Sequence, residues 1–354
     1  MKNNPFSVLW TACCFLLLFA SFTAYGQGRK KPKTSHFLWL AKGQKVPRLL
    51  ALSPAFAAQQ GYVSDPNLGK LFFKPVTSPK EVIEQLNETK DLKSKGVKVF
   101  MESGFGMGRI PLLSNEIRQA IRTECKLRNL PLYIHSSTEE DHAMALDMEP
   151  LALVHGSSIS SNAVLERLKQ KPVYLMSTLS IQDGFTVEFN KDRLSDPFFT
   201  NSVPEIELQS ANEKSAWQNL RLRFAKMIVT DKGTDEEVAN LTKPKSPSTA
   251  AIATWMKNIK KLHAAGIPIV MGSDSGNWPV MPQAFHGPTS IREIELLTLS
   301  GLTPLEAIRA STSLPAKMLE IVQHIGSIEE GKIADLVIVE GTPQDDIKAL
   351  KNIK

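Results

Sequence analysis

The chain has 354 residues, of which 42% are apolar and 22% are charged, and its formal net charge is +6. This length supports one large α/β domain or two smaller domains, each with a buried core. The Lys and Arg residues are scattered, and no basic stripe is interleaved with aromatic residues, which argues against nucleic-acid binding.

Residues 1–26 have the pattern of a secretory signal peptide. An apolar core at 8–22 precedes two small residues, Ala24 and Gly26, at the spacing that a signal peptidase requires. This core is shorter than the ~20 apolar residues that span a bilayer comfortably. We therefore expect a cleaved signal, no stable membrane span afterwards, a basic linker at 27–36 and a periplasmic or secreted protein.

From residue 48 onward, short apolar runs alternate with amphipathic helical patterns. Strands that are apolar throughout favour parallel pairing with both faces buried. The motifs at 78–81 and 303–306 each combine a capping hydroxyl, a Pro and a Glu, which predicts helix starts. The stretch 180–248 lacks a strand pattern and is predicted to be an insertion with a helix over 209–228. The predicted strands are 48–52, 97–101, 131–134, 151–154, 172–176 and 267–271.

Polar side chains follow several of these strands, and their placement favours a βα barrel over a doubly wound sheet. His135, His155 and Asp274 each stand at a strand end, and the two-residue period puts Lys98 and Glu102 on one face of their strand. In a βα barrel the carboxyl ends of the strands form one shared mouth. Imidazoles and carboxylates that meet there suit zinc and similar divalent ions.

Taken singly, these residues allow other interpretations. Lys98 could sit in an ion pair, and Asp274 could serve as a turn former. Cys125 is the only cysteine after the predicted signal peptide, so a disulfide framework and a thiolate metal site are excluded. Three further histidines in helical or turn patterns are interpreted as structural: His142, His263 and His324.

The C-terminal part of the sequence resembles a known family. The motif GSDSG at 272–276, the run beginning HGPTSIREIELL at 286 and the signature GSIEEGKIADLVIV at 326–339 are similar to the amidohydrolase superfamily. The similarity is to the branch that includes imidazolonepropionase-like enzymes and Xaa-Pro dipeptidases. It continues upstream through the segments around the predicted strands and covers roughly 37–352.

The resemblance implies an incomplete TIM-type barrel of about six of the eight strands over 37–323, with a remnant of a small β-sandwich at 324–354. The family's His-x-His motif at the end of strand one is absent, because His36 is the only histidine upstream of Lys98. We therefore expect strands one and two to be missing and the chain to be an incomplete form of a longer enzyme. Open sheet edges favour self-association, so a homo-oligomer is a possible state.

The resemblance also implies residue roles. His135 and His155 match metal-binding histidines, and Lys98 matches a lysine that is carboxylated in several members. Asp274 matches a ligand and base that deprotonates the attacking water and returns the proton to the leaving amine. Glu102 is the ligand expected if the lysine is unmodified. Without the His-x-His pair, we expect one divalent ion, zinc in the first instance, rather than two.

The expected substrate is a small amide, cyclic amide or dipeptide, hydrolysed at a carbon–nitrogen bond. His286 is expected near this substrate, and Arg109 is a candidate partner for a substrate carboxylate, with Phe105 and Met107 beside it at the mouth. Two alternatives stay open: a catalytically inactive relative that binds a small molecule or a protein partner, and an ester or lactone hydrolase on the same scaffold.

Overall fold

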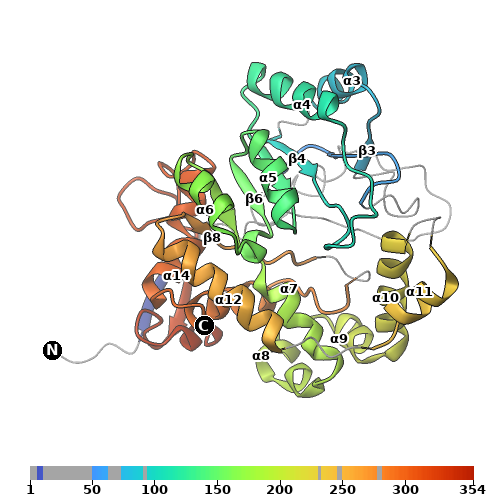
Figure 1. Cartoon of the computed structure of the whole chain (residues 1–354). Coiled ribbons are helices and arrows are strands. Elements are labelled where there is room, and N and C mark those ends of the chain that lie inside the picture. Colours follow the sequence, from blue (N-terminus) through green and yellow to red (C-terminus); the bar gives the residue numbers. More distant parts are fainter. Residues whose placement is uncertain are drawn as a thin grey trace, which may run out of the picture.

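The computed structural model of the chain describes residues 6–10, 50–62, 73–90, 94–229, 233–244, 249–276 and 281–354. A main parallel sheet, covering helices, a helical insertion and a small second sheet make up the fold (Figure 1). The strands of the main sheet are β2 (Ala55–Ala57), β3 (Phe73–Pro75), β4 (Val97–Phe100), β5 (Leu132–His135), β6 (Ala152–Val154), β7 (Tyr174–Met176) and β8 (Ile269–Val270).

The main sheet runs in the order β3-β2-β4-β5-β6-β7-β8, and every neighbouring pair is parallel. The prediction of an α/β fold with an incomplete parallel barrel is therefore confirmed. The described strands β3 and β8 stand at opposite edges and do not pair with each other, so the arc is open. From β4 to β8 the spatial order follows the chain order.

The first strand of the sheet begins later than the predicted 48–52, because regular pairing starts only at β2. Ala51 and Ser53 already exchange backbone hydrogen bonds with residues 95–96, at 2.8 and 3.0 Å. Pro54 has no N–H to continue this ladder, and regular pairing begins only after it. Residues 48–49 lie outside the described part of the chain.

The sheet has seven described strands rather than the six predicted, because β3 adds a further edge strand beside β2. Its sequence, Phe-Lys-Pro, contains no apolar run and carries no alternation signal. A proline is tolerated at a sheet edge, where its missing N–H breaks no ladder. Because β3 is short and mixed in polarity, its sequence does not predict a strand.

The covering helices begin where their capping motifs predict. The Ser78 hydroxyl accepts from the N–H of Glu81, and Thr303 and Glu306 form a complete capping box. These helices are α3 (Pro79–Thr89), α4 (Asn115–Leu127), α5 (Glu139–Asp147), α6 (Asn162–Lys169), α12 (Thr249–Ala264), α13 (Pro288–Leu299), α14 (Pro304–Ser311) and α15 (Ser313–Met318).

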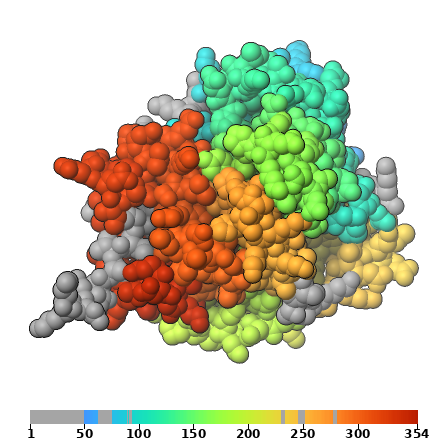
Figure 2. All heavy atoms as spheres, turned by 60° about the vertical axis from the view of Figure 1, so that its left-hand side comes forward, coloured from blue at the N-terminus to red at the C-terminus, as the bar shows by residue number. Residues whose placement is uncertain are grey.

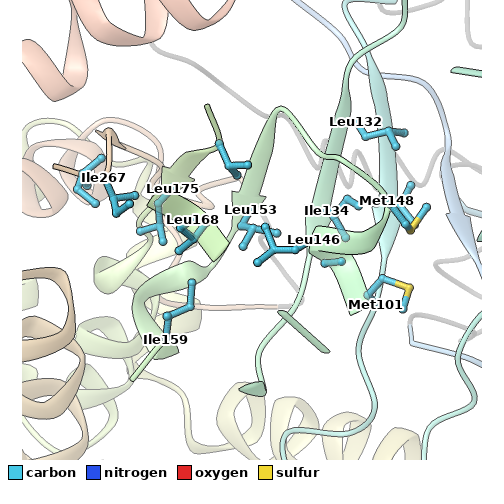
Figure 3. Packing of buried hydrophobic residues seen from close by; sticks show 14 of the residues in the cluster. Met101, Leu132, Ile134, Leu146, Met148, Leu153, Ile159, Leu168, Leu175 and Ile267 are labelled. Carbon is cyan, nitrogen blue, oxygen red and sulfur yellow. The ribbon is translucent and has the colours of Figure 1, made fainter. Parts of the chain in front are cut away.

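The outer face of the sheet packs against the helices and forms the main core. Ile134, Leu153 and Leu175 lie side by side on β5, β6 and β7, and Leu146 of α5 and Leu168 of α6 pack over them (Figure 3). All five side chains are at most 1% exposed. Burying a side chain of this size contributes roughly 1.5–3 kcal/mol, so this layer fixes the strand positions.

The inner face carries the polar residues. The register pairs Lys98 with Tyr133 and Phe100 with His135, so these four side chains face the interior of the arc. Apolar neighbours such as Val154 complete the inner layer. The pattern therefore buries a lysine and a histidine among apolar groups near the carboxyl ends of the strands.

The predicted insertion is confirmed as helical and has a core of its own. It consists of α7 (Leu179–Gly184), α8 (Pro197–Thr200), α9 (Glu205–Asn212), α10 (Lys214–Val229) and α11 (Asp235–Leu241). Figure 1 shows α8 to α11 grouped together, far from α3 and α4.

The helical pattern predicted over 209–228 is confirmed, but Glu213, which is extended, divides it between α9 and α10. The break lets α10 turn so that Trp217 is 1% exposed. Its indole N–H donates to the Ala211 carbonyl oxygen at 2.9 Å, which ties the start of α10 back to the end of α9.

The C-terminal region forms a second, two-stranded sheet. Strand β9 (Leu336–Glu340) pairs antiparallel with β1 (Phe6–Trp10), which belongs to the predicted signal peptide. The rest of that peptide and the basic linker lie outside the described residues, and their cleavage and role stay predictions. Among the described helices, none combines the length and apolar character needed to cross a bilayer. In Figure 2 the C-terminal region (red) and the segment around α12 and α13 (orange) form one continuous surface.

Candidate active site

Two of the predicted metal ligands meet at the carboxyl ends of β5 and β6. The ring centroids of His135 and His155 are 4.5 Å apart, with the rings inclined at 70°. His155 follows Val154, which points inward, so a regular strand would turn His155 toward the helices. A left-handed backbone conformation at His155, with φ of 66°, breaks the alternation and accompanies the contact between the two imidazoles.

Glu102 is buried beside His135 and is fully hydrogen-bonded. Its Oε2 lies 3.3 Å from His135 Nε2 and accepts from the Ser137 hydroxyl at 2.5 Å. Its Oε1 accepts from the backbone N–H groups of Gly104 and Phe105 at 2.7 and 2.6 Å. A carboxylate has acceptor sites for all these donors. When the imidazole is neutral, this contact puts the proton on Nε2 of His135 and leaves Nδ1 with a lone pair.

Lys98 lies inside the arc, 3% exposed, with its ammonium nitrogen 5.3 Å from the ring centroid of Phe100. Burial lowers the pKa of Lys98 to about 7, and the negative charge of Asp274 opposes this decrease. Burial also lowers the pKa of His135 and of His155 well below the ordinary value, and the positive charge of Lys98 contributes. Both imidazoles are therefore neutral at pH 7, which is the form that binds metals.

Asp274 follows β8 in a left-handed conformation, with φ of 48°, and is partly exposed. Its negative charge raises the pKa of Tyr62 and opposes the lowering of the pKa of Lys98, so the carboxylate lies near both groups. Tyr62 stacks on His135 with centroids 4.8 Å apart, and burial, Glu102 and Asp274 all raise the pKa of its hydroxyl. Tyr62 belongs to no recognisable motif, so its place beside His135 is visible only in the folded chain.

His155 is held by a residue that the sequence did not single out. Its Nδ1 lies 2.7 Å from the hydroxyl oxygen of Thr178, which directly precedes α7. This contact engages one ring nitrogen and leaves Nε2 for a ligand. A hydroxyl after an apolar strand is too common to be a signal, so only the folded chain reveals this pair.

A buried pair at the start of α5 links three strand ends. Asp141 accepts from the backbone N–H and the hydroxyl of Ser103, at 3.2 and 3.0 Å. The two ring nitrogens of His142 contact the hydroxyl oxygens of Ser136 and Ser158, at 2.7 and 2.9 Å. These serines follow β4, β5 and β6. These contacts agree with the structural role predicted for His142.

The two predicted substrate residues lie farther out. His286 is exposed, and its ring lies against Gly276, where an added Cβ would come within 2.5 Å of the imidazole Cε1. Gly276 is two residues after Asp274, so His286 lies against the loop that carries the predicted base. Arg109 is 43% exposed and forms a 2.8 Å ion pair with Glu237 of α11. A role of either residue toward a substrate stays a prediction.

The predicted metal ligands provide two imidazoles for a divalent ion, but, in the part of the chain that the structure describes, no complete set of three ligands. Within the described residues, no three His, Cys, Asp or Glu side chains are already grouped around a common point. The predicted site depends instead on two neutral imidazoles together with Lys98. His135 and His155 each have one nitrogen engaged by a hydrogen-bonding partner, Glu102 or Thr178, which is the usual arrangement of metal-binding histidines.

A sequence profile of the amidohydrolase family matches residues 77–354. The chain belongs to this family. The predicted resemblance to amidohydrolases is thus confirmed over the segment that carries His135, His155 and Asp274. A curated relative, the ochratoxinase of Aspergillus niger, is 33% identical over 91 residues, which are 25% of this chain and 17% of the ochratoxinase. The matched part spans less than a fifth of that relative's length.

Solved structures share the fold of this amidohydrolase at low sequence identity. An Xaa-Pro dipeptidase with bound methionine has a TM-score of 0.60 at 20% identity, covering 89% of this chain and 67% of the dipeptidase. A putative prolidase from Bifidobacterium longum gives 0.59 at 21%, covering 90% and 68%. The A. niger ochratoxinase structure gives 0.58 at 20%, covering 87% and 64%.

Proposed function

We propose that this amidohydrolase is a metal-dependent hydrolase of carbon–nitrogen bonds in amides, cyclic amides or dipeptides. The proposal rests on the contact between the imidazoles of His135 and His155, whose ring centroids are 4.5 Å apart. The positive charge of the nearby Lys98 helps to keep His155 neutral. Asp274 adds a carboxylate that acts on the same lysine. The fold shared with an Xaa-Pro dipeptidase and a prolidase supports a dipeptide as the first substrate to test.

His135 and His155 would hold one divalent ion, zinc in the first instance, through Nδ1 and Nε2 respectively. When bound, such an ion acts as a Lewis acid that acidifies water and polarises a carbonyl oxygen. Lys98 would supply the third ligand after carboxylation. Its pKa of about 7 leaves much of its amine uncharged at neutral pH, and the uncharged amine is the form that reacts with carbon dioxide. Glu102 is better suited to orient His135, because its oxygens already accept four contacts.

Asp274 would act as the general base and acid. It stands at the carboxyl end of β8, partly exposed, where it can accept a proton from the attacking water. It then returns the proton to the amide nitrogen, which leaves poorly unless protonated. His286, whose ring lies against Gly276, would contact the bound substrate, and Arg109 would exchange Glu237 for a substrate carboxylate.

The test combines metal analysis with turnover. Purified chain is incubated with zinc and a panel of Xaa-Pro dipeptides and N-acyl amino acids, and released amino acids are quantified by mass spectrometry. Asp274→Asn should lower kcat by about 10²–10⁴-fold, and His135→Ala should abolish stoichiometric zinc. His263→Gln, on α12, is the matched control. Zinc binding without turnover of any amide would contradict the proposal.

A second candidate is an inactive relative that binds ligands at the same site. Two observations favour it: the missing His-x-His motif, and the lack of a ready three-residue metal group among the described side chains. Turnover of aryl esters or lactones alone would instead support an esterase on this scaffold. A periplasmic or secreted location is proposed with the hydrolase and is tested by fractionating cells that express the whole chain.

A further inference from the structure

Helix α7 does not use the capping residue that its sequence provides. Thr178 stands at the N-cap position, where a threonine hydroxyl ordinarily accepts from a backbone N–H of the first turn. It makes no such bond. Its hydroxyl oxygen instead lies 2.7 Å from Nδ1 of His155, one of the two imidazoles in the candidate active site.

The capping task is taken over by a side chain from another helix. Glu293 of α13 is 0% exposed, and its two carboxylate oxygens accept from the N–H groups of Leu179 and Ser180, at 3.1 and 2.6 Å. These are the first two residues of α7. Buried N–H groups at a helix start must find acceptors, so Glu293 satisfies donors that Thr178 leaves unpaired.

The backbone on both sides of the hydrogen bond is strained. Thr178 has φ of 153° and His155 has φ of 66°, both in regions that residues other than glycine rarely adopt. Such conformations cost on the order of 1–3 kcal/mol each and persist only where the surroundings enforce them. The bonds from Glu293 hold the two residues that follow Thr178, and a bond from the Ser177 N–H to the Val270 carbonyl oxygen holds the residue before it.

We propose that Glu293 is a positioning residue: by capping α7 it frees the Thr178 hydroxyl to hold His155 as the Nδ1–H tautomer, with Nε2 available for a metal ion. The choice of tautomer rests on the proposed metal-dependent function. Without the Glu293 carboxylate, the first N–H groups of α7 lack acceptors, and one of them donates to the Thr178 hydroxyl oxygen as in an ordinary N-cap. The imidazole of His155 then loses its partner.

The first arm of the test alters the hydroxyl. Thr178→Val removes it and keeps the branched shape, whereas Thr178→Ser keeps it. In metal-free protein labelled with ¹⁵N-histidine, long-range NMR correlations report the tautomer of His155, whose signal is assigned by its loss in His155→Gln. We expect the Nδ1–H form in the wild type and in Thr178→Ser, and a mixture of tautomers in Thr178→Val.

The second arm alters the cap. Glu293→Gln replaces one acceptor oxygen by an amide that cannot accept, and we expect the same mixture of tautomers as in Thr178→Val. The matched control is Asp183→Asn, because Asp183 also joins α7 to α13 through two 2.9 Å bonds from Arg292 but makes no cap. The control should lower the melting temperature and leave the tautomer of His155 unchanged.

Zinc affinity gives the second readout, measured by competition with a chelating dye. Loss of an outer partner of a metal-binding histidine weakens affinity by about 10–100-fold. We expect this loss in Thr178→Val and Glu293→Gln, and no further loss when the two are combined, because both act through one hydrogen bond. Thr178→Ser should stay within about threefold of the wild type.

Wild-type tautomer in Thr178→Val would overturn the proposal, as would a Glu293→Gln protein that behaves like Asp183→Asn. If circular dichroism shows that Glu293→Gln does not fold, Glu293→Asp takes its place, since the shorter carboxylate weakens the cap and keeps the charge. If the wild-type protein binds no zinc, the proposed metal-dependent function is contradicted. The tautomer of His155 would still decide this inference.

Discussion

Protonation of the buried His142 should cost the fold a defined amount of stability in acid. Burial lowers the pKa of this imidazole to about 4 from an ordinary 6.5, although the charges of Glu139 and Glu102 oppose the decrease. As the pH falls from about 6.5 to about 4, the unfolded chain therefore binds a proton that the folded chain does not. Stability is complete above pH 6.5, falls through this window and levels off below pH 4. At about 1.4 kcal/mol for each pH unit, the loss is about 3 kcal/mol.

The assay compares urea unfolding of the wild type and His142→Gln from about pH 7 to about pH 4, followed by tryptophan fluorescence. Glutamine cannot become charged, so the variant should lose about 3 kcal/mol less than the wild type over this range. Asp141 and Glu139 also titrate nearby, and they contribute to both proteins alike. His263→Gln, which removes a partly exposed imidazole of α12, should follow the wild type. Equal losses in the wild type and His142→Gln, within about 0.5 kcal/mol, would refute the argument.

Four further outcomes are expected. Leu153→Ala should lower the free energy of unfolding by about 2–5 kcal/mol in urea titration, because this fully buried side chain joins the sheet to its helices. Asp183→Ala should cost about 1.5–3 kcal/mol by calorimetry, since it removes the carboxylate that Arg193 and Arg292 share and leaves Arg292 with Glu295 alone. Gly276→Ala should lower kcat/KM for dipeptides, because its Cβ collides with the His286 ring and its φ of 88° disfavours alanine. Arg109→Gln should change stability by less than about 1 kcal/mol and raise KM about tenfold for dipeptides but not for their C-terminal amides.

The fold followed from local patterns wherever those patterns were long. Apolar runs located β4 to β8 within one or two residues, and hydroxyl–Pro–Glu motifs located the starts of α3 and α14. Patterns failed where a segment was short or interrupted. Strand β3 has three residues with no alternation, and Pro54 delayed the first strand. The break at Glu213 interrupts an otherwise continuous helical pattern, and no proline or glycine in the sequence marks it.

The candidate site also has features that the sequence predicted and features that it did not. Strand ends predicted that His135, His155 and Lys98 would face one interior, because parallel strands in a barrel present their carboxyl ends together. No pattern predicted that His155 would need a left-handed backbone to do so. Nor did one predict that Tyr62 would stack on His135, because its ring comes from a loop with no signature.

The sequence by itself determined the α/β class, the family and the residues that could bind a metal, because these depend on residue type and on periods of two and 3.6 along one segment. The tertiary structure alone decided which nitrogen of each imidazole stays available and which side chain caps α7. Glu293 and Thr178 are more than a hundred residues apart in the chain. Glu293 contacts Leu179 and Ser180, the residues directly after Thr178, only because α13 packs against α7, and packing of that kind leaves no periodic trace in either segment.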